Sequence, residues 1–333
     1  MTRMHSDETP PPEPRRRNER PLAVVAMGGH AFMQAGQPAT IEVHEQNATE
    51  ISAVLMTLIE RDYNVVITHG NGPQVGQLLL QTALTHDKVP AMPLDVLVAD
   101  TEGWLGYILQ QALLNEMRHR NVQRYVVTMV TQVLVDKNDP AFLKPTKPVG
   151  RFMNQEEAQG CSKEYGWKIV EDAGRGWRRV VPSPEPKRVV QWRMIRDSAL
   201  AGHVVIAGGG GGIPIIKNTR GDYDGVEAVI DKDLTSSIIA GSIGADLLII
   251  LTAVPQVYVN FNTPEQRPLG AVTREEIERL IHEGHFPPGS MGPKVLAIHR
   301  FLQGGGRRGL VTDAPTLHAA LEGRGGTHFV GRL

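Results

Sequence analysis

Three lysines stand in settings that suit the binding of an anionic, phosphate-bearing ligand. Lys147 is held between two prolines, and Lys232 and Lys294 each occupy a position where a helix is expected to begin. A helix N-terminus attracts anions through its free N–H groups and its dipole. A lysine there weakens the helix while adding positive charge, and such a local conflict is typical of a functional site. A solvated surface position is the alternative for each lysine taken alone.

Glycine-rich turns could supply neutral donors for the same anion. The tract Gly208 to Gly212 and the segments Gly28-Gly29 and His69-Gly-Asn-Gly72 each follow a run of apolar residues that reads as a strand. Because glycine has no side chain, its backbone N–H group can approach a ligand closely. We therefore expect free N–H groups along one rim where anions are held. A flexible linker is the alternative for the tract of five.

Several common catalytic motifs are absent from the sequence. It contains no Gly-x-x-x-x-Gly-Lys-Ser/Thr, no Gly-x-Ser-x-Gly and no His-Glu-x-x-His. A dinucleotide pattern is missing after the first apolar run, and the histidines lack metal-ligand spacing. Cys161 is the single cysteine, so no internal disulfide can form. These absences leave the lysines and the glycine turns as the main chemical signal, and no metal ligands are predicted.

Charge and hydropathy exclude further classes of protein. The formal net charge of −1 and the low aromatic content of 5% do not favour a nucleic-acid partner. No apolar run approaches the ~20 residues that span a bilayer, and the N-terminus has no apolar region typical of a secretory signal. We therefore expect a cytoplasmic protein with no membrane partner.

Apolar runs and helical periodicities alternate along most of the 333 residues. This alternation predicts an α/β fold, a three-layer αβα sandwich with a mainly parallel central sheet. The expected strands are 22–26, 65–68, 125–135, 204–207 and 247–251. The expected helices are 41–60, 73–84, 101–119, 231–242, 274–282, 293–303 and 315–321.

Two segments depart from the alternation. Residues 1–20 are rich in Pro, Arg, Glu and Asp and are predicted to be a disordered tail. Residues 136–186 are rich in Pro, Gly, Lys, Arg and Trp, and a structureless loop of that length is uncommon in a compact domain. We expect this second segment to form a small protruding subdomain.

Several segments together resemble the carbamate kinases, which belong to the amino acid kinase fold group. The resemblance covers nearly everything after Arg20, in the same order. Its segments are 26–31 (Ala-Met-Gly-Gly-His-Ala), 68–76 (Thr-His-Gly-Asn-Gly-Pro-Gln-Val-Gly), 92–95 (Met-Pro-Leu-Asp), 131–136 (Thr-Gln-Val-Leu-Val-Asp), 145–150 (Pro-Thr-Lys-Pro-Val-Gly), 174–184 (Gly-Arg-Gly-Trp-Arg-Arg-Val-Val-Pro-Ser-Pro), 225–233 (Gly-Val-Glu-Ala-Val-Ile-Asp-Lys-Asp) and 289–294 (Gly-Ser-Met-Gly-Pro-Lys).

The resemblance implies a reversible kinase reaction and an architecture to match. Carbamoyl phosphate and ADP would give carbamate and ATP with Mg²⁺, in the setting of arginine metabolism and in a homodimer. An N-terminal lobe, residues 21–215, would hold the carbamoyl substrate and carry the protruding subdomain 136–186. A C-terminal lobe, residues 216–333, would bind the nucleotide.

The matching motifs also imply roles for single residues. The catalytic set would be Lys147, Lys232, Asp233 and Lys294. The carbamoyl phosphate would be cradled by Gly28, Gly29, His30, Gly70, Asn71 and Gly72. The nucleotide cleft would be lined by Gly209, Gly210, Tyr258, Met291 and Lys294. Carbamate is already an anionic nucleophile, so the absence of a clear general base fits this reaction.

Two residues depart from the family pattern. His30 stands where the family usually has asparagine, and Pro255 stands where it usually has aspartate. A bulkier, titratable side chain could change the acceptor, and proline removes an N–H group near the nucleotide. Two alternatives therefore stay open: a related kinase with another small acceptor, and a sensor of carbamoyl phosphate or nucleotide. A nicotinamide-dependent dehydrogenase is a more distant alternative.

Overall fold

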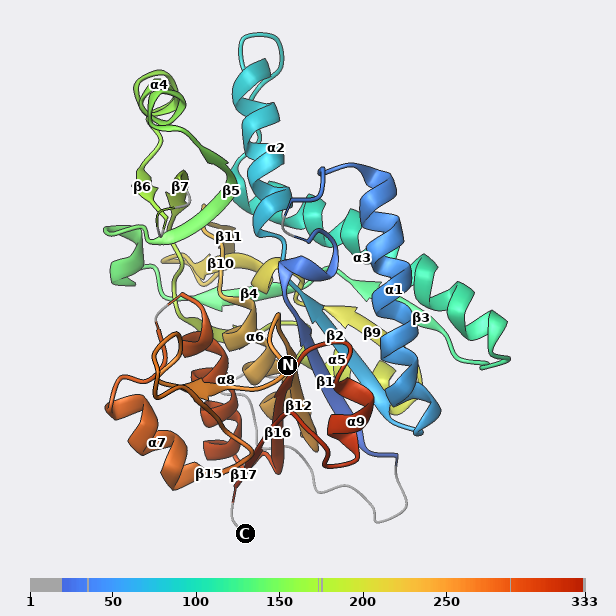
Figure 1. The fold of residues 1–333 in the computed structure, drawn as a ribbon. Coiled ribbons are helices and arrows are strands. Elements are labelled where there is room, and N and C mark those ends of the chain that lie inside the picture. Colours follow the sequence, from blue (N-terminus) through green and yellow to red (C-terminus); the bar gives the residue numbers. More distant parts are fainter. Residues whose placement is uncertain (1–19, 35, 173, 175, 288, 332–333) are drawn as a thin grey trace.

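The computed structural model describes residues 20–331, apart from 35, 173, 175 and 288, and the side chain of His30 is also outside the description. Most of the predicted tail, residues 1–19, therefore lies outside the described residues. The described chain forms an α/β fold around one large sheet (Figure 1). The predicted fold class is confirmed.

The central sheet has eight strands and runs through both halves of the chain. Every neighbouring pair is parallel except β16 and β17, which are antiparallel. The order is β15 (Ala271–Thr273), β17 (Thr327–Val330), β16 (Arg308–Thr312), β12 (Leu247–Leu251), β1 (Leu22–Met27), β2 (Asn64–His69), β9 (Val204–Ala207) and β3 (Val126–Met129). Because β1 pairs with β12 in register Ala23 to Leu247, the two expected lobes share one continuous sheet. The division into lobes stays a prediction.

Alternate residues of the central strands feed two separate cores. In β1, Leu22, Val24 and Ala26 face one core, while Ala23 and Val25 face the other. The first core is closed by α5 (Trp192–Leu200), α6 (Lys232–Ser242), α7 (Arg274–His282) and α8 (Met291–Gln303). The second is closed by α1 (Ile41–Glu60), α3 (Leu94–His119) and α9 (Leu317–Leu321). A sheet covered on both faces explains why its strands are continuous apolar runs.

The predicted strand 125–135 is two strands in two sheets. β3 ends at Met129, and β4 (Gln132–Val135) joins a second sheet of order β11-β10-β4-β8, with β11 (Tyr223–Gly225), β10 (Ile213–Lys217) and β8 (Pro186–Val189). At the break, Glu102 of α3 accepts a hydrogen bond from the Thr131 backbone N–H at 2.8 Å. An uninterrupted β-branched run hid this change of sheet. Helix α3 also begins earlier than predicted, because the Glu227 carboxylate accepts from the Leu94 N–H at its first residue.

The segment predicted to protrude has its own small sheet. It contains η2 (Pro140–Phe142) and the strands β5 (Lys147–Met153), β7 (Trp177–Val181) and β6 (Ile169–Glu171), which pair antiparallel in that order, with α4 (Gln155–Tyr165) between β5 and β6. Figure 1 shows these elements standing beside α2 (Gly72–Thr85), away from the central sheet. Helix α4 starts at a capping box of Asn154 and Glu157 and ends at Gly166, whose φ is 65°.

Four further short elements complete the description. A hairpin of β13 (Tyr258–Val259) and β14 (Arg267–Pro268) follows β12, and 3-10 turns lie at η1 (Gly29–Ala31) and η3 (Gly209–Gly211). Across the part of the chain that the structure describes, no helix combines the length and apolar character needed to span a bilayer.

Candidate active site

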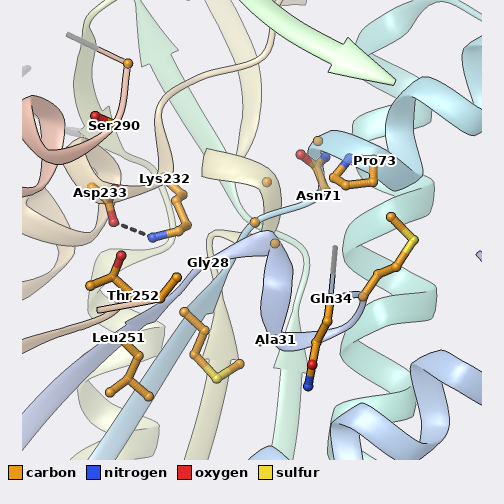
Figure 2. A pocket seen from close by; sticks show the side chains of 18 of the residues that line it. Gly28, Ala31, Gln34, Asn71, Pro73, Lys232, Asp233, Leu251, Thr252 and Ser290 are labelled. Carbon is orange, nitrogen blue, oxygen red and sulfur yellow. Dashed lines mark hydrogen bonds and ion pairs between the residues drawn. The ribbon is translucent and has the colours of Figure 1, made fainter. Parts of the chain in front are cut away.

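A cleft of about 1340 Å³ opens at the carboxyl ends of the central strands. Open α/β sheets bind ligands at this edge, because loops from several strands meet there. The cleft is lined by the turn after β1, the start of α2, the first residues of β5, the start of α6 and the start of α8. Figure 2 shows Gly28, Asn71 and Lys232 around this space. Elements far apart in the sequence therefore contribute to one site.

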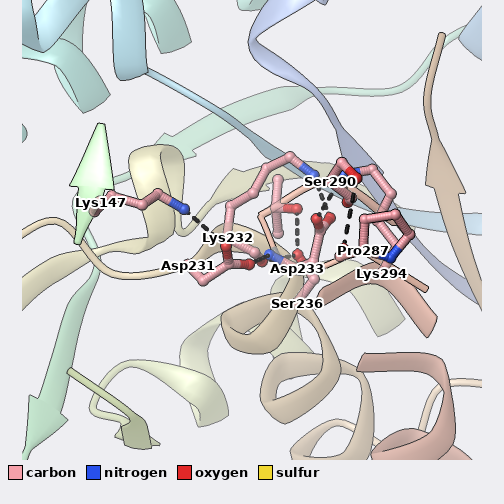
Figure 3. A network of polar contacts seen from close by, with 9 residues as sticks. Lys147, Asp231, Lys232, Asp233, Ser236, Pro287, Ser290 and Lys294 are labelled. Carbon is pink, nitrogen blue, oxygen red and sulfur yellow. Dashed lines mark hydrogen bonds and ion pairs between the residues drawn. The ribbon is translucent and has the colours of Figure 1, made fainter. Parts of the chain in front are cut away.

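Four of the predicted catalytic residues meet in one charged cluster (Figure 3). The Lys147 ammonium lies 2.7 Å from Asp231 Oδ2. Asp233 receives two lysines: Lys232 Nζ contacts its Oδ1, and Lys294 Nζ lies 3.2 Å from its Oδ2. The Asp231 carboxylate also accepts from the Asp233 backbone N–H at 2.9 Å, which caps α6. Three ammonium groups and two carboxylates are thus gathered at the N-termini of α6 and α8.

The cluster carries one positive charge more than its carboxylates balance. Burial raises the pKa of Asp231, but the ammonium groups of Lys147, Lys232 and Lys294 outweigh it and hold that pKa well below its usual value. The pKa of Lys232 is lowered, chiefly by burial and also by Lys294, although Asp233 acts in the opposite direction. Lys232 is therefore a partly uncompensated cation, which an incoming anion would stabilise. The electrostatics favour a phosphate ligand over a cation.

The glycine tract is more enclosed than the sequence predicted. All five residues, Gly208 to Gly212, are buried. The N–H of Gly208 donates to Thr131 Oγ1 at 2.9 Å, and those of Gly211 and Gly212 donate to Gly208 and Gly209 carbonyls. The expectation that the tract leaves its donors free is therefore wrong for these three, and also for Gly209, whose N–H group donates to the Glu102 carboxyl. Of the two glycines predicted to line the nucleotide cleft, Gly210 is among the described lining residues and Gly209 is not.

A layer of polar side chains lies directly beneath the tract. Added Cβ atoms would come within 2.6 Å of the His69 ring at Gly209 and within 2.2 Å of the Asn71 amide at Gly210. Asn71 in turn donates to Thr101 Oγ1 of α3 at 2.8 Å. Glycine is required at these positions because the polar layer leaves no room for a side chain. The tract is therefore packed tightly between α3 and the cleft.

Glu102 is the central member of that layer. Its side chain is buried, its Oε2 accepts from Thr131 N–H, and its Oε1 has no hydrogen-bond partner among the described residues. Burial raises the pKa of Glu102 well above its usual value, although the backbone N–H groups of Thr131 and Gly209 lower it. Burial therefore favours the neutral form of Glu102, and its hydrogen bond to Thr131 holds the break between β3 and β4 beside the glycine turn.

The remaining predicted residues are placed as follows. Gly28, Gly29, Gly70, Asn71 and Gly72 line the cleft together, and Tyr258 and Met291 line it from the C-terminal half. Pro255 is not among the described lining residues. The role predicted for His30 falls on a side chain outside the described part of the structure.

Sequence reasoning missed four residues of the site. Asp231 was not predicted beside the Lys-Asp pair, although an aspartate at the start of an expected helix is typical of a cap. Phe261 lines the cleft next to Tyr258, with ring centroids 6.1 Å apart. Arg178 also lines the cleft; its Nε donates to the Gly150 carbonyl at 3.1 Å, and its guanidinium lies over Phe152. Glu102 reads as an ordinary helical residue, and no local pattern reveals its burial.

The described residues offer no ready-made metal centre. Within residues 20–331, apart from the gaps noted above, no group of three or more His, Cys, Asp or Glu side chains is arranged to hold an ion. Two carboxylates, Asp231 and Asp233, do stand at the cleft. This set suits an ion that arrives with a phosphate ligand, because Mg²⁺ is usually held by one or two carboxylates plus substrate phosphates.

The chain is similar to known proteins over most of its length. The sequence model of the amino acid kinase family matches residues 21–313. A carbamate kinase of Thermococcus kodakarensis is 49% identical over 310 residues, covering 92% of this chain and 98% of that protein. A carbamate kinase structure from Giardia lamblia bound to citric acid matches with a TM-score of 0.89 at 39% identity, covering 93% of this chain and 98% of its own. The same enzyme bound to AMP-PNP matches with a TM-score of 0.86 at 40% identity and the same coverage.

The buried carboxyl group of Glu102, which accepts from Thr131, suggests a matched pair of variants. Glu102→Gln keeps a neutral acceptor for Thr131 and is expected to retain turnover within about threefold. Glu102→Ala leaves two buried N–H groups unpaired, a loss of about 1–3 kcal/mol. That loss is one of folding stability; because the glycine turn beside the cleft also loses its support, we expect kcat/KM to fall by about tenfold, which corresponds to ~1.4 kcal/mol of activation free energy. Steady-state kinetics on both variants, with thermal melts as a folding control, would contradict this role if the two behaved alike.

His69 predicts acid sensitivity. Burial lowers its pKa from 6.5 to about 4, a hydrogen bond to the Gly70 carbonyl opposes this, and Lys232 lowers it further. Between those values the unfolded chain binds the proton that the folded protein rejects, so stability falls as the pH drops from 6.5 to 4. His69→Gln removes that loss of stability, which is roughly 3 kcal/mol because each pKa unit corresponds to ~1.4 kcal/mol. Urea unfolding at several pH values should show the difference between variant and wild type changing across this window and staying constant above pH 7.5; a constant difference throughout would reject the assignment.

Proposed function

The chain belongs to the amino acid kinase family, and from this premise we propose that it is a carbamate kinase. It transfers a phosphoryl group reversibly between carbamoyl phosphate and ADP, giving carbamate and ATP. The observation that carries the proposal is the cluster of Lys147, Lys232 and Lys294 around Asp231 and Asp233. The same cleft is lined by the glycines of the turns after β1 and β2 and by the aromatic residues Tyr258 and Phe261.

The reaction needs positioning and charge stabilisation more than proton transfer. In the direction of ATP synthesis, a terminal oxygen of ADP forms a bond to phosphorus while the bond from phosphorus to the carbamate oxygen breaks. The electron pair of the broken bond stays on the carbamate oxygen, so no proton has to move. Lys147, Lys232 and Lys294 stabilise the negative charge spread over the transferring group. We assign Asp231 and Asp233 the task of holding these lysines in place.

The two ends of the cleft suit the two substrates. We assign carbamoyl phosphate to the rim of Gly28, Gly29, Gly70, Asn71 and Gly72, where backbone N–H groups can approach an anion. We assign the nucleotide base to the recess beside Tyr258, Phe261 and Met291. Aromatic and thioether side chains favour a flat apolar ring system over a small anion. Residues 21–215 would then serve the carbamoyl substrate and residues 216–333 the nucleotide.

The chemistry of the donor set fits a magnesium ion carried by the nucleotide. Asp231 and Asp233 are the carboxylates that would hold it, together with the nucleotide phosphates. Such an ion, when bound, neutralises charge on the phosphates. The ammonium groups of the cluster orient the same phosphates from the protein side, so the protein needs no dedicated metal cage.

The decisive test is ATP formation from carbamoyl phosphate and MgADP. We expect robust synthesis by the wild-type chain, loss of activity when EDTA removes the metal, and a fall in kcat of ~10²-fold or more for Lys147→Ala, by analogy with loss of one preorganised donor. Lys232→Ala and Lys294→Ala should each behave similarly. A chain that binds ADP yet makes no ATP would contradict the proposal and point to another acceptor or a sensor.

We also propose that the protein is a homodimer. Strand β3 ends the central sheet with one described neighbour, β9, and Tyr125 (74% exposed) and Val130 (55% exposed) flank it. Tyr107 of α3 is also exposed, at 58%. An open sheet edge with apolar neighbours favours pairing with another chain. Sedimentation equilibrium should give twice the chain mass of 36.5 kDa. The double variant Tyr107→Asp, Tyr125→Asp should lower the measured mass towards that of a single chain. A wild-type chain that stays at 36.5 kDa would exclude the dimer.

A further inference from the structure

Helix α2 and strand β5 touch through a pair of glycines. An ideal Cβ atom built on Gly76 would lie 1.9 Å from Gly150 Cα and 2.1 Å from Gly150 N. Both of these contacts are to backbone, so a side chain at Gly76 cannot be accommodated by a rotamer change. Gly150 itself has φ of +77°, a conformation that glycine adopts without strain. The protruding subdomain therefore approaches α2 as closely as two backbones allow.

The glycine contact lies next to the catalytic cluster along both elements. Strand β5 begins at Lys147, three residues before Gly150, and Lys147 reaches Asp231 at 2.7 Å. Helix α2 begins at Gly72, at the rim assigned to the carbamoyl substrate. The contact thus joins the element that carries the reaching lysine to the element that starts at the substrate rim.

The surroundings make the contact rigid. Val149 of β5 and Val75 of α2 are buried in one apolar cluster on either side of the two glycines. The Gly150 carbonyl accepts a hydrogen bond from Arg178 Nε at 3.1 Å, and Arg178 is paired with Asp172 at 3.1 Å. A displacement of β5 from α2 would therefore move the strand as a unit rather than one residue at a time.

We propose that Gly76 is a positioning residue that sets how far Lys147 reaches into the cleft. The inference rests on the proposed catalytic role of Lys147. Because Gly76 has only a hydrogen atom as its side chain, β5 can pack close enough to α2 for the Lys147 ammonium to reach Asp231. An ordinary carbon–carbon contact needs about 3.4 Å or more, so a methyl group would push β5 outward by more than an ångström. A misplacement of about 1 Å at a reacting group can cost ~10²-fold in rate.

The test combines Gly76→Ala with Lys147→Ala. Gly76→Ala is expected to lower kcat for ATP formation about tenfold or more while KM for ADP stays within about twofold, because the aromatic recess lies in the other half of the cleft. Since the glycine acts through the lysine, adding Lys147→Ala to Gly76→Ala should cost much less than Lys147→Ala costs alone. A residue that merely supported the fold would lower stability and leave the two losses multiplicative.

A matched control is available in the same subdomain. Gly160 lies inside helix α4, and a Cβ atom there would meet nothing within 4 Å. Gly160→Ala makes the same chemical change without a clash and is expected to keep wild-type turnover. Thermal melts and ADP titration establish that each variant is folded.

The possible outcomes separate the two levels of the proposal. Wild-type turnover in folded Gly76→Ala, or fully multiplicative losses in the double variant, would overturn the role of Gly76 and leave the kinase assignment intact. Wild-type turnover in Lys147→Ala would overturn the role of Lys147 itself. If Gly76→Ala does not fold, Gly150→Ala perturbs the same contact from the strand side, because a Cβ atom there would lie 3.4 Å from Gly76 Cα and φ of +77° is strained for alanine; full turnover in that folded variant would equally overturn the proposal, and a coupled loss with Lys147→Ala would support it.

Discussion

The excess of one positive charge among Lys147, Lys232 and Lys294 is the constraint on which the rest of the site depends. Like charges gathered in a partly buried place repel one another, and carboxylates from one turn of α6 must hold them there. The three lysines come from a subdomain strand and from the first turns of two helices. Their meeting point is fixed because each of those elements is anchored in a packed core.

The continuous sheet supplies that anchorage. Strands β1 and β12 pair in register although they are separated by most of the chain, so the cleft residues that follow β1 and those that follow β12 are held by neighbouring strands of one sheet. The subdomain has its own sheet and is not part of this framework. It is located instead by apolar burial of Val149 beside Val75 and by the approach of two glycines. The position of Lys232 and Lys294 therefore depends on the central sheet and its helices, whereas the position of Lys147 depends on the contact between the subdomain and α2.

Much of this arrangement could be predicted from local sequence. Continuous apolar runs predicted five of the eight central strands, and lysines beside helix starts predicted most of the charged cluster, because both signals lie within a few residues. The strands β15, β16 and β17 were not predicted. The break at Thr131 could not be predicted, since it depends on Glu102 from a distant helix. The approach of Gly76 to Gly150 and the burial beneath the glycine tract were hidden for the same reason: partners far apart in the chain create them, and a single sequence holds no record of their proximity.

The packed glycine tract has a consequence for how the protein loses structure. Glycine gives up more backbone freedom on folding than any other residue, so five in succession make this turn entropically expensive to order. Here the tract is held in one conformation by close packing against His69, Asn71 and Val133, which lie in β2, immediately before α2 and in β4. The turn and the core therefore share one cooperative unit, and local fraying of the site is coupled to global unfolding. Hydrogen-exchange protection at the tract would be that of a sheet interior, not that of a surface loop.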